Sequence, residues 1–455
     1  MSDGNPSIPL LGTFLVTLLA GCGGVLAVGC LSEPAASPVG GASAPASIRH
    51  TTFESEGVAE TLARITVRCD TCAWDQTGSE AVVLTIKLDD RAIQRLPVVR
   101  TGRAEYHVLL GPVAGGPHTV VIDEDPELTA ASLCGKGAAA VEKIVVEQIA
   151  ESAANYIPVS RAPIVYARPD TVGRFTDVPV LMWYEVEPSA RGTRYRYTVM
   201  FTNEDGGTPA DRLMATWGRT TDIEYLYSVE VDAGGAVLTE DMQGPEHEIL
   251  PFKGRREGHH PLLWVSTENN MVLDRGTTTV RYAPAPMPVR LADVSREAVM
   301  DANPWTYEVM SKELMREGKI VPDSLPGTGA IPDPRRYAYL EGCGVAGDNA
   351  LAFAVRVGDA WISSDRGVPA YRITRDGCVR AAIPLPGSTN ARDIRAVRVQ
   401  AFERTDRPSA APARFTRLNT LFSLDERFAP GPTMVRWKGS AALTPGGPPL
   451  EIRVP

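Results

Sequence analysis

The sequence predicts a mainly β protein, built from two or three β-sandwich domains with one short helical segment. Short runs of alternating apolar and polar residues recur along most of the chain, and turn residues separate them. Only one stretch has the apolar spacing and the end signals of helices. A chain of 455 residues is also too long for one ordinary domain, so each domain should bury its own core.

The charge balance argues against a nucleic acid partner. The formal net charge is -9, and the basic residues, nearly all Arg, are scattered without a basic run. Binding to nucleic acid depends largely on attraction between basic side chains and phosphates. We therefore expect no nucleic acid among the partners of this chain.

Residues 1–22 resemble the signal of a bacterial lipoprotein. Residues 8–31 contain no charge, and within them Leu19-Ala20-Gly21-Cys22 matches the pattern in which the cysteine becomes the lipidated first residue. The first nine residues depart from this pattern, because they hold one Asp and no Lys or Arg, whereas export signals start with positive charge. The alternative is an uncleaved anchor, since the apolar run is long enough to span a bilayer. Both place the rest of the chain outside the cytoplasm, attached to the membrane of the bacterial cell envelope.

Residues 23–59 are predicted to be a flexible tether, because residues 32–47 are rich in Pro, Ala, Ser and Gly and cannot form a core. Residues 60–150 should form an immunoglobulin-like β-sandwich. Its expected strands are 62–68, 82–88, 106–110 and 118–122, whereas residues 141–149 fit either a closing strand or a helix.

A second β-sandwich is expected over residues 160–290. Its alternating runs are 180–186, 195–201, 223–231, 262–267 and 277–282. Period two places Ile223, Tyr225, Tyr227, Val229 and Val231 on a packed face, and Asp222, Glu224, Ser228 and Glu230 on a solvent face. Two residues apart on a strand, Asp222 and Glu224 should lie about 6 to 7 Å apart and reach one cation or polar ligand. The alternative is an ordinary solvated strand face.

Asp222 and Glu224 are the candidate metal ligands. Calcium and magnesium prefer oxygen ligands, and two carboxylates on one strand face supply them together with negative charge. Arg219 favours the other outcome, because its guanidinium would neutralise the pair and leave a salt-bridged surface.

Three segments of this region follow one another in an order that occurs in known families. They are Ala162-Pro163-Ile164-Val165-Tyr166-Ala167-Arg168-Pro169-Asp170, Gly218-x-x-x-Asp222-x-Glu224 and His260-Pro261-Leu262-Leu263-Trp264-Val265. This order resembles the vacuolar-protein-sorting-related family and the necrosis- and ethylene-inducing proteins. In the second family a Gly-His-Arg-His-Asp-Trp-Glu segment helps to hold a divalent cation, and the toxins act on sphingolipid headgroups. The resemblance implies the same for Gly218, Asp222 and Glu224, although Arg219 and Thr221 replace the two His.

Residues 291–320 should be the helical segment, with Tyr307, Met310 and Leu314 on a face that packs against a sheet. A Pro- and Gly-rich linker over residues 321–336 follows. Residues 337–455 return to alternating runs and should form a C-terminal β-domain.

The cysteines predict disulfides, as expected for an exported protein. Setting Cys22 aside for lipid leaves an even number. Cys343 and Cys378 lie in one predicted domain and should pair, and Cys134 should pair with Cys69 or Cys72. The alternative interpretation of Cys69-x-x-Cys72 as half of a zinc site lacks a second pair at suitable spacing.

These observations favour a non-catalytic binding lipoprotein of the cell surface or periplasm, whose middle domain engages a polar ligand or headgroup with a divalent cation. One alternative is an extracytoplasmic hydrolase of glycans or lipid headgroups, with Asp222 and Glu224 as its acid/base pair. Such a pair needs an environment that raises one pKa, which an exposed strand does not supply. Another alternative is a structural component of the envelope.

Overall fold

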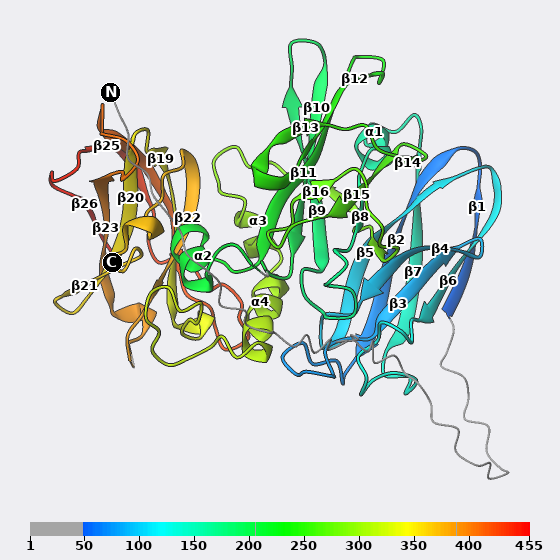
Figure 1. The fold of residues 1–455 in the computed structure, drawn as a ribbon, viewed down its shortest axis with the longest axis horizontal. Helices are drawn as coiled ribbons and strands as arrows, with labels where there is room; N and C mark the ends of the chain where they lie inside the picture. Colours follow the sequence, from blue (N-terminus) through cyan, green and yellow to red (C-terminus); the bar gives the residue numbers. More distant parts are fainter. Residues whose placement is uncertain (1–48, 205, 388) are drawn as a thin grey trace, which may run out of the picture.

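Strands dominate the computed structural model, which describes residues 49–455 except residues 205 and 388. Strands account for 46% of the described residues and helices for 10%, which confirms the mainly β class with several sheets. Figure 1 shows the sheets in chain order, from the N-terminal strands in blue, through the middle strands in green, to the C-terminal strands in yellow and red.

The first two sheets enclose one apolar core between them. One sheet has the order β1 (Arg49–Ser55), β6 (Gly116–Glu124), β3 (Val83–Leu88) and β4 (Arg91–Pro97). The other has the order β5 (Gly102–Val113), β2 (Ala59–Cys69) and β7 (Ala140–Ala150). The segment that fitted a strand or a helix is therefore a strand.

Strand β1 corrects the predicted tether of residues 23–59. Residues 49–55 pair with β6 along their whole length, and Phe53 packs against the core beside the ring of His118. A short polar run such as Arg-His-Thr-Thr carries little strand signal of its own, because its pairing with β6 decides its structure. Residues 23–48 of the predicted tether lie outside the described residues.

The middle region also consists of two sheets with a shared core. The larger sheet has the order β13 (Ile249–Pro251), β12 (Val237–Gln243), β11 (Asp222–Val231), β10 (Thr193–Phe201), β9 (Pro179–Pro188) and β18 (Pro286–Pro288). The smaller sheet has the order β14 (Arg256–Glu257), β15 (His260–Val265), β8 (Ile164–Tyr166) and β17 (Arg281–Tyr282), and β16 (Val272–Leu273) also pairs with β15.

Two buried polar contacts tie the middle region to its neighbours. The Nε2 atom of His260 is 3.0 Å from a carboxylate oxygen of Glu60 in β2, and its Nδ1 atom is 2.8 Å from the carbonyl oxygen of Ala162. The Tyr197 hydroxyl donates a hydrogen bond of 2.8 Å to the carbonyl of Pro158, which lies in the short helix α1 (Tyr156–Ser160). Because these groups are buried, removing one partner would leave the other without a hydrogen bond.

Helices α2 (Ala210–Trp217), α3 (Ala298–Ala302) and α4 (Trp305–Arg316) lie between the middle sheet and the C-terminal sheets (Figure 1). Tyr307, Met310 and Leu314 are buried there in a further core that includes residues of both sheets, which confirms the packed helix face. The sequence did not predict α1 or α2, whose few residues carry too short a pattern to signal a helix.

The C-terminal strands form two more sheets around a core of their own. One has the order β22 (Gly377–Pro384), β19 (Tyr337–Val345), β24 (Ala413–Phe422) and β25 (Trp437–Leu443). The other has the order β21 (Ala360–Ser363), β20 (Asn349–Val357), β23 (Ile394–Glu403) and β26 (Leu450–Arg453). In the part of the chain that the structure describes, no helix has both the length and the apolar character needed to cross a membrane.

Candidate functional site

A β-bulge in β11 reverses the predicted faces for residues 222–225, whereas Tyr227, Val229 and Val231 lie on the packed face as predicted. Leu226 is an extra residue that the pairing with β10 skips, and such a bulge shifts the alternation of side chains by one position. Asp222 and Glu224 lie opposite Phe201 and Val199, and opposite residues share a face, so both carboxyls point into the middle sandwich. The predicted solvent-exposed face is therefore wrong: Asp222 is 1% exposed and Glu224 is half-buried. The other face of β11 carries Ile223, Tyr225, Ser228 and Glu230.

Asp222 and Glu224 do lie together, as a hydrogen-bonded pair of carboxyls. Burial raises the pKa of Glu224 well above its usual range, and the charge of Asp222 raises it further. Burial also raises the pKa of Asp222, although the nearby charge of Arg219 opposes this rise. A proton held by Glu224 can then serve as the donor between the two side chains.

Donors of the protein surround this carboxyl pair. The side-chain amide of Asn270 donates to Asp222 at 3.0 Å, and the buried guanidinium of Arg219 lies 4.0 Å from the same carboxylate. Arg219 also donates to Glu297 at 3.0 Å. Burial opposes the ionisation of Glu297, but the charges of Arg219 and two other arginines outweigh it and lower the pKa of Glu297 to about 2. The positive charge of Arg219 thus lies close to two carboxyl groups, those of Asp222 and Glu297.

The same carboxyl pair affects the pKa of Glu204, which follows β10 in the chain. Burial raises the pKa of Glu204 to about 7, and the charge of Asp222 contributes to the rise. Among the described residues, no group of three or more His, Cys, Asp or Glu side chains is placed to hold a metal ion. Calcium or magnesium binding by Asp222 and Glu224 stays a prediction.

A groove of about 670 Å³ crosses the C-terminal sheet on the face turned away from that domain's core. Strand pairing connects the disulfide to this groove: Cys378 lies opposite Cys343, Cys343 opposite Arg417, and Arg417 opposite Lys438, of which Arg417 and Lys438 line the groove. One row of side chains therefore crosses β22, β19, β24 and β25. The disulfide stands at one end of this row and a lysine at the other.

Arg380, two residues from Cys378 on β22, lines the groove although its side chain is only 1% exposed. Its guanidinium donates to Asp301 at 2.6 and 2.7 Å, to Glu341 at 2.9 Å and to the Tyr307 hydroxyl at 2.7 Å. Its Nε atom has no hydrogen-bond partner in the described residues. Burial opposes the charge of Arg380, but these neighbours outweigh it and raise its pKa, so Arg380 is a permanent cation.

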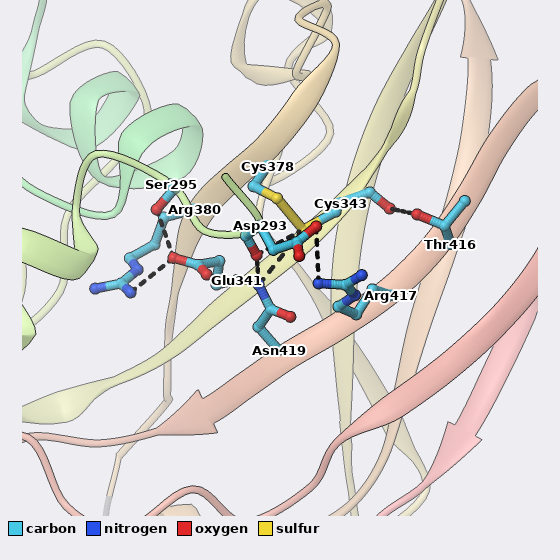
Figure 2. The surroundings of a disulfide bond; sticks show 9 residues. All are labelled: Asp293, Ser295, Glu341, Cys343, Cys378, Arg380, Thr416, Arg417 and Asn419. Atoms are coloured by element: carbon cyan, nitrogen blue, oxygen red, sulfur yellow. Dashed lines mark hydrogen bonds and ion pairs between the residues drawn. A yellow bond between two sulfur atoms is a disulfide. The ribbon is translucent and has the colours of Figure 1, made fainter. Parts of the chain in front are cut away.

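The segment before α3 holds one edge of the groove in place (Figure 2). The Ser295 hydroxyl donates to Glu341 at 2.5 Å, and the Asn419 amide donates to Glu341 and to the carbonyl of Asp293, both at 2.8 Å. Arg417 forms an ion pair with the Asp293 carboxylate at 3.2 Å. Residues far apart in sequence are thereby fixed around one cluster.

The open side of the groove is positive. Arg436 and Lys438 are exposed, line the groove and form no ion pair within the part of the chain described. Trp437, between them in sequence, also lines the groove, and its ring stacks on Phe415 with centroids 5.8 Å apart. Four cationic side chains face two carboxylates there: Arg380, Arg417, Arg436 and Lys438 against Asp301 and Glu341.

The disulfides correct one of the two predicted pairings. Cys343 is bonded to Cys378, as expected for two cysteines in one domain. Cys69 is bonded to Cys72, so the predicted pairing of Cys134 with either of them is wrong. Cys134 is itself disulfide-bonded. The Cys-x-x-Cys spacing allowed a local bond, with the two Cα atoms 5.5 Å apart, which the sequence argument had not weighed.

Of the predicted site residues, Cys343 and Cys378 lie beside the groove, since Cys343 pairs with Arg417, but they do not line it; Asp222 and Glu224 lie in another domain. Sequence reasoning missed the groove because strand register, which the sequence alone does not give, places its residues side by side. The only local signal was the run Arg436-Trp437-Lys438, which places two cations and an aromatic ring together.

No protein-family model matches this chain, and no curated protein matches it either. The resemblances to the two β-sandwich families and to the lipoprotein signal stay predictions. Cys22 lies outside the described residues.

Proposed function

We propose that this chain is a non-catalytic binding protein of the bacterial cell envelope, held at the membrane by lipid on Cys22, which binds an anionic glycan in the groove beside the Cys343–Cys378 disulfide. The observation that carries this proposal is the positive side of the groove. Arg436 and Lys438 are exposed, form no ion pair with any described residue and flank Trp437, and the buried cation of Arg380 lines the same groove.

The groove has the groups that an acidic sugar chain requires. Sugar rings present apolar C–H faces that pack on aromatic side chains, and the part of the Trp437 side chain that the core leaves uncovered lines the groove. Their hydroxyls need hydrogen-bond partners, and Asn419, Thr420 and Thr433 line the same groove. Carboxylate, sulfate or phosphate substituents form charge-assisted hydrogen bonds with Arg and Lys. A volume of about 670 Å³ suits several sugar units.

Two observations support an extracytoplasmic location. The disulfides Cys69–Cys72 and Cys343–Cys378 persist in oxidising compartments, whereas cytosolic proteins usually keep their thiols reduced. The lipoprotein-like segment that ends at Cys22 agrees with export. The lipid would then place the groove at the envelope, where acidic glycans occur.

The proposal is tested by calorimetry with tetragalacturonate and with an uncharged tetrasaccharide of galactose. The acidic sugar should bind, the neutral one should bind more weakly, and the difference should shrink at high salt. A double variant, Arg436→Gln with Lys438→Gln, should weaken binding of the acidic sugar by about tenfold, at roughly 0.5 to 1 kcal/mol for each exposed contact.

Arg275→Gln is the matched control, because Arg275 is 82% exposed in the middle domain and lies outside the groove. Its binding should equal that of the parent protein. Equal affinity of the double variant and the parent would reject the groove as the site. Binding to phosphatidylglycerol vesicles without binding to the sugar would reject a glycan in favour of a lipid headgroup.

A second candidate function, hydrolysis of glycans or lipid headgroups, is favoured by one observation. The pKa of Glu224 is raised by burial beside the Asp222 carboxyl, and this is the kind of environment that an acid/base pair requires. Release of reducing sugar or phosphate by the parent protein, abolished in Glu224→Gln, would support it. Release that persists in this variant, or none from the parent, would exclude the pair as a catalytic centre.

A further inference from the structure

We propose that a cavity between the N-terminal sandwich and the middle region binds a small apolar carboxylate. The cavity has a volume of about 200 Å³. Its walls come from β4, β5 and β9, from residues 282–287 and from Trp305 at the start of α4. It is separate from the groove of the C-terminal domain, so this inference does not depend on the proposed function.

The walls of the cavity are mainly apolar. Tyr106, Tyr282 and Trp305 contribute rings, and Val108, Leu181 and Met287 contribute aliphatic groups. Such a cavity at a junction between domains, with a few polar groups at its edge, is the usual form of a small-molecule site. Atoms that line an empty space lose dispersion contacts, and a ligand that fills it recovers them. Engineered apolar cavities of about 150 Å³ bind benzene, so this volume accommodates a ring or a chain of about six to eight carbons.

Arg100 determines the charge of the ligand. Its guanidinium lies 5.3 Å from the centre of the Trp305 ring, at the wall of the cavity, and forms no ion pair within the described residues. The other charged groups of the lining have partners: Arg95 pairs with Asp125 at 2.5 Å, and Glu105 with His107 at 2.8 Å. Arg100 is therefore the cation left to pair with an anionic head group.

A carboxylate with an apolar tail satisfies both features. Its tail would fill the space between Tyr106, Tyr282 and Trp305, while its head would pair with Arg100 and remain partly in water. A neutral molecule with the same tail would gain only the apolar contacts. A short carboxylate without a tail would gain only the exposed ion pair, which is weak in water.

Calorimetry of the mature full-length protein with octanoate, octan-1-ol and acetate tests this inference. Octanoate should bind at one site, octan-1-ol about tenfold more weakly, and acetate not measurably. Arg100→Gln should reduce the affinity for octanoate to that for octan-1-ol and leave octan-1-ol unchanged. Arg103→Gln is the matched control, since Arg103 is exposed on β5 three residues after Arg100, pairs with Glu142 and does not line the cavity.

Filling the cavity tests its location. Ala285 lines it and is half-buried, so Ala285→Phe should abolish binding of both octanoate and octan-1-ol. Ala92→Phe, on an exposed position of β4 outside the lining, is the control. If the melting temperature shows that Ala285→Phe does not fold, Val180→Phe fills the cavity from β9. Absence of octanoate binding to the parent at millimolar concentration, or unchanged binding in a folded filling variant, would overturn the proposal.

Discussion

The backbone of Gly218 lies directly against the side chain of Arg380. A Cβ atom at Gly218 would be only 2.6 Å from Cγ of Arg380, and Gly218 itself has a φ of +66° at the end of α2. The glycine therefore ends a helix of the middle region and also leaves room for the buried arginine of β22. Arg380 in turn donates hydrogen bonds to Tyr307 of α4 and to Glu341, which lines the groove.

Gly218→Ala should destabilise the protein by about 2 to 4 kcal/mol. The left-handed conformation costs an alanine about 1 kcal/mol, and the methyl group must also displace Arg380 from its carboxylate partners. Gly347→Ala is the matched control, because Gly347 has a φ of +59° with no atom within 4 Å of its added Cβ, and it should lose only about 1 kcal/mol. Urea unfolding measures both, and equal losses would contradict the clash with Arg380.

Removal of the Cys343–Cys378 disulfide should lower the free energy of unfolding. The bond closes a loop with a sequence separation of 35 between neighbouring strands, for which loop entropy predicts about 3 to 4 kcal/mol. The Cys343→Ala, Cys378→Ala double variant should unfold at lower urea concentration than the oxidised parent. A reducing agent should lower the urea midpoint of the parent more than that of the variant, because only the parent contains the Cys343–Cys378 bond. A variant as stable as the oxidised parent would show that strand pairing alone fixes this register.

Much of the fold followed from alternation in the sequence, because a strand with one buried face must repeat every two residues. The residues around β2, β3, β5, β6, β9, β10 and β20 show this pattern, and all of them are strands. The bulge at Leu226 could not be foreseen in this way, since it depends on how β11 meets β10. One inserted residue turned Asp222 and Glu224 from the predicted solvent face into the sandwich.

The site was harder to predict than the fold for a related reason. Arg380, Arg417 and Lys438 are distant in sequence and meet only through the register of four strands. Asp301 reaches Arg380 from a helix that packs across the sheet. Pairing of Cys343 with Cys378 was predictable because both lie in one domain, but nothing in that argument identified the groove beside them.

Stability should decrease between about pH 5 and pH 8, with Glu204 as one cause. The unfolded carboxyl has a pKa near 4.5, and in the folded protein burial and the charge of Asp222 raise it to about 7. Between these values the folded state binds more protons than the unfolded state, so the stabilising contribution is complete at low pH and is lost as pH rises through the folded pKa. Glu204→Gln should flatten this decrease in urea unfolding across the range. Asp359→Asn, at a fully exposed position, should leave the slope unchanged; an unaltered slope in Glu204→Gln would contradict the assignment.

The mature protein should begin at Cys22 with lipid attached. Cleavage before the cysteine of Leu19-Ala20-Gly21-Cys22 would leave a diacylated residue, and one acyl chain alone would hold the protein only marginally. Mass spectrometry of the native N-terminal peptide should therefore show Cys22 with several acyl chains. Cys22→Ala should release the protein from the membrane fraction. Detection of an intact Met1 segment would instead indicate the uncleaved anchor.

Calcium or magnesium can bind to Asp222 and Glu224 only if the pair gives up the proton that it holds. Burial and the charge of Asp222 keep the pKa of Glu224 high, so proton and cation compete for the same oxygens. Affinity should therefore rise with pH, and each bound ion should release a proton, which calorimetry in two buffers of different ionisation heat measures. The Asp222→Asn, Glu224→Gln double variant should lose the binding, whereas Glu187→Gln, on a half-exposed side chain of β9, should keep it. If the parent protein binds neither cation at millimolar concentration and alkaline pH, Arg219 and Asn270 already satisfy these carboxyls, and the pair is structural.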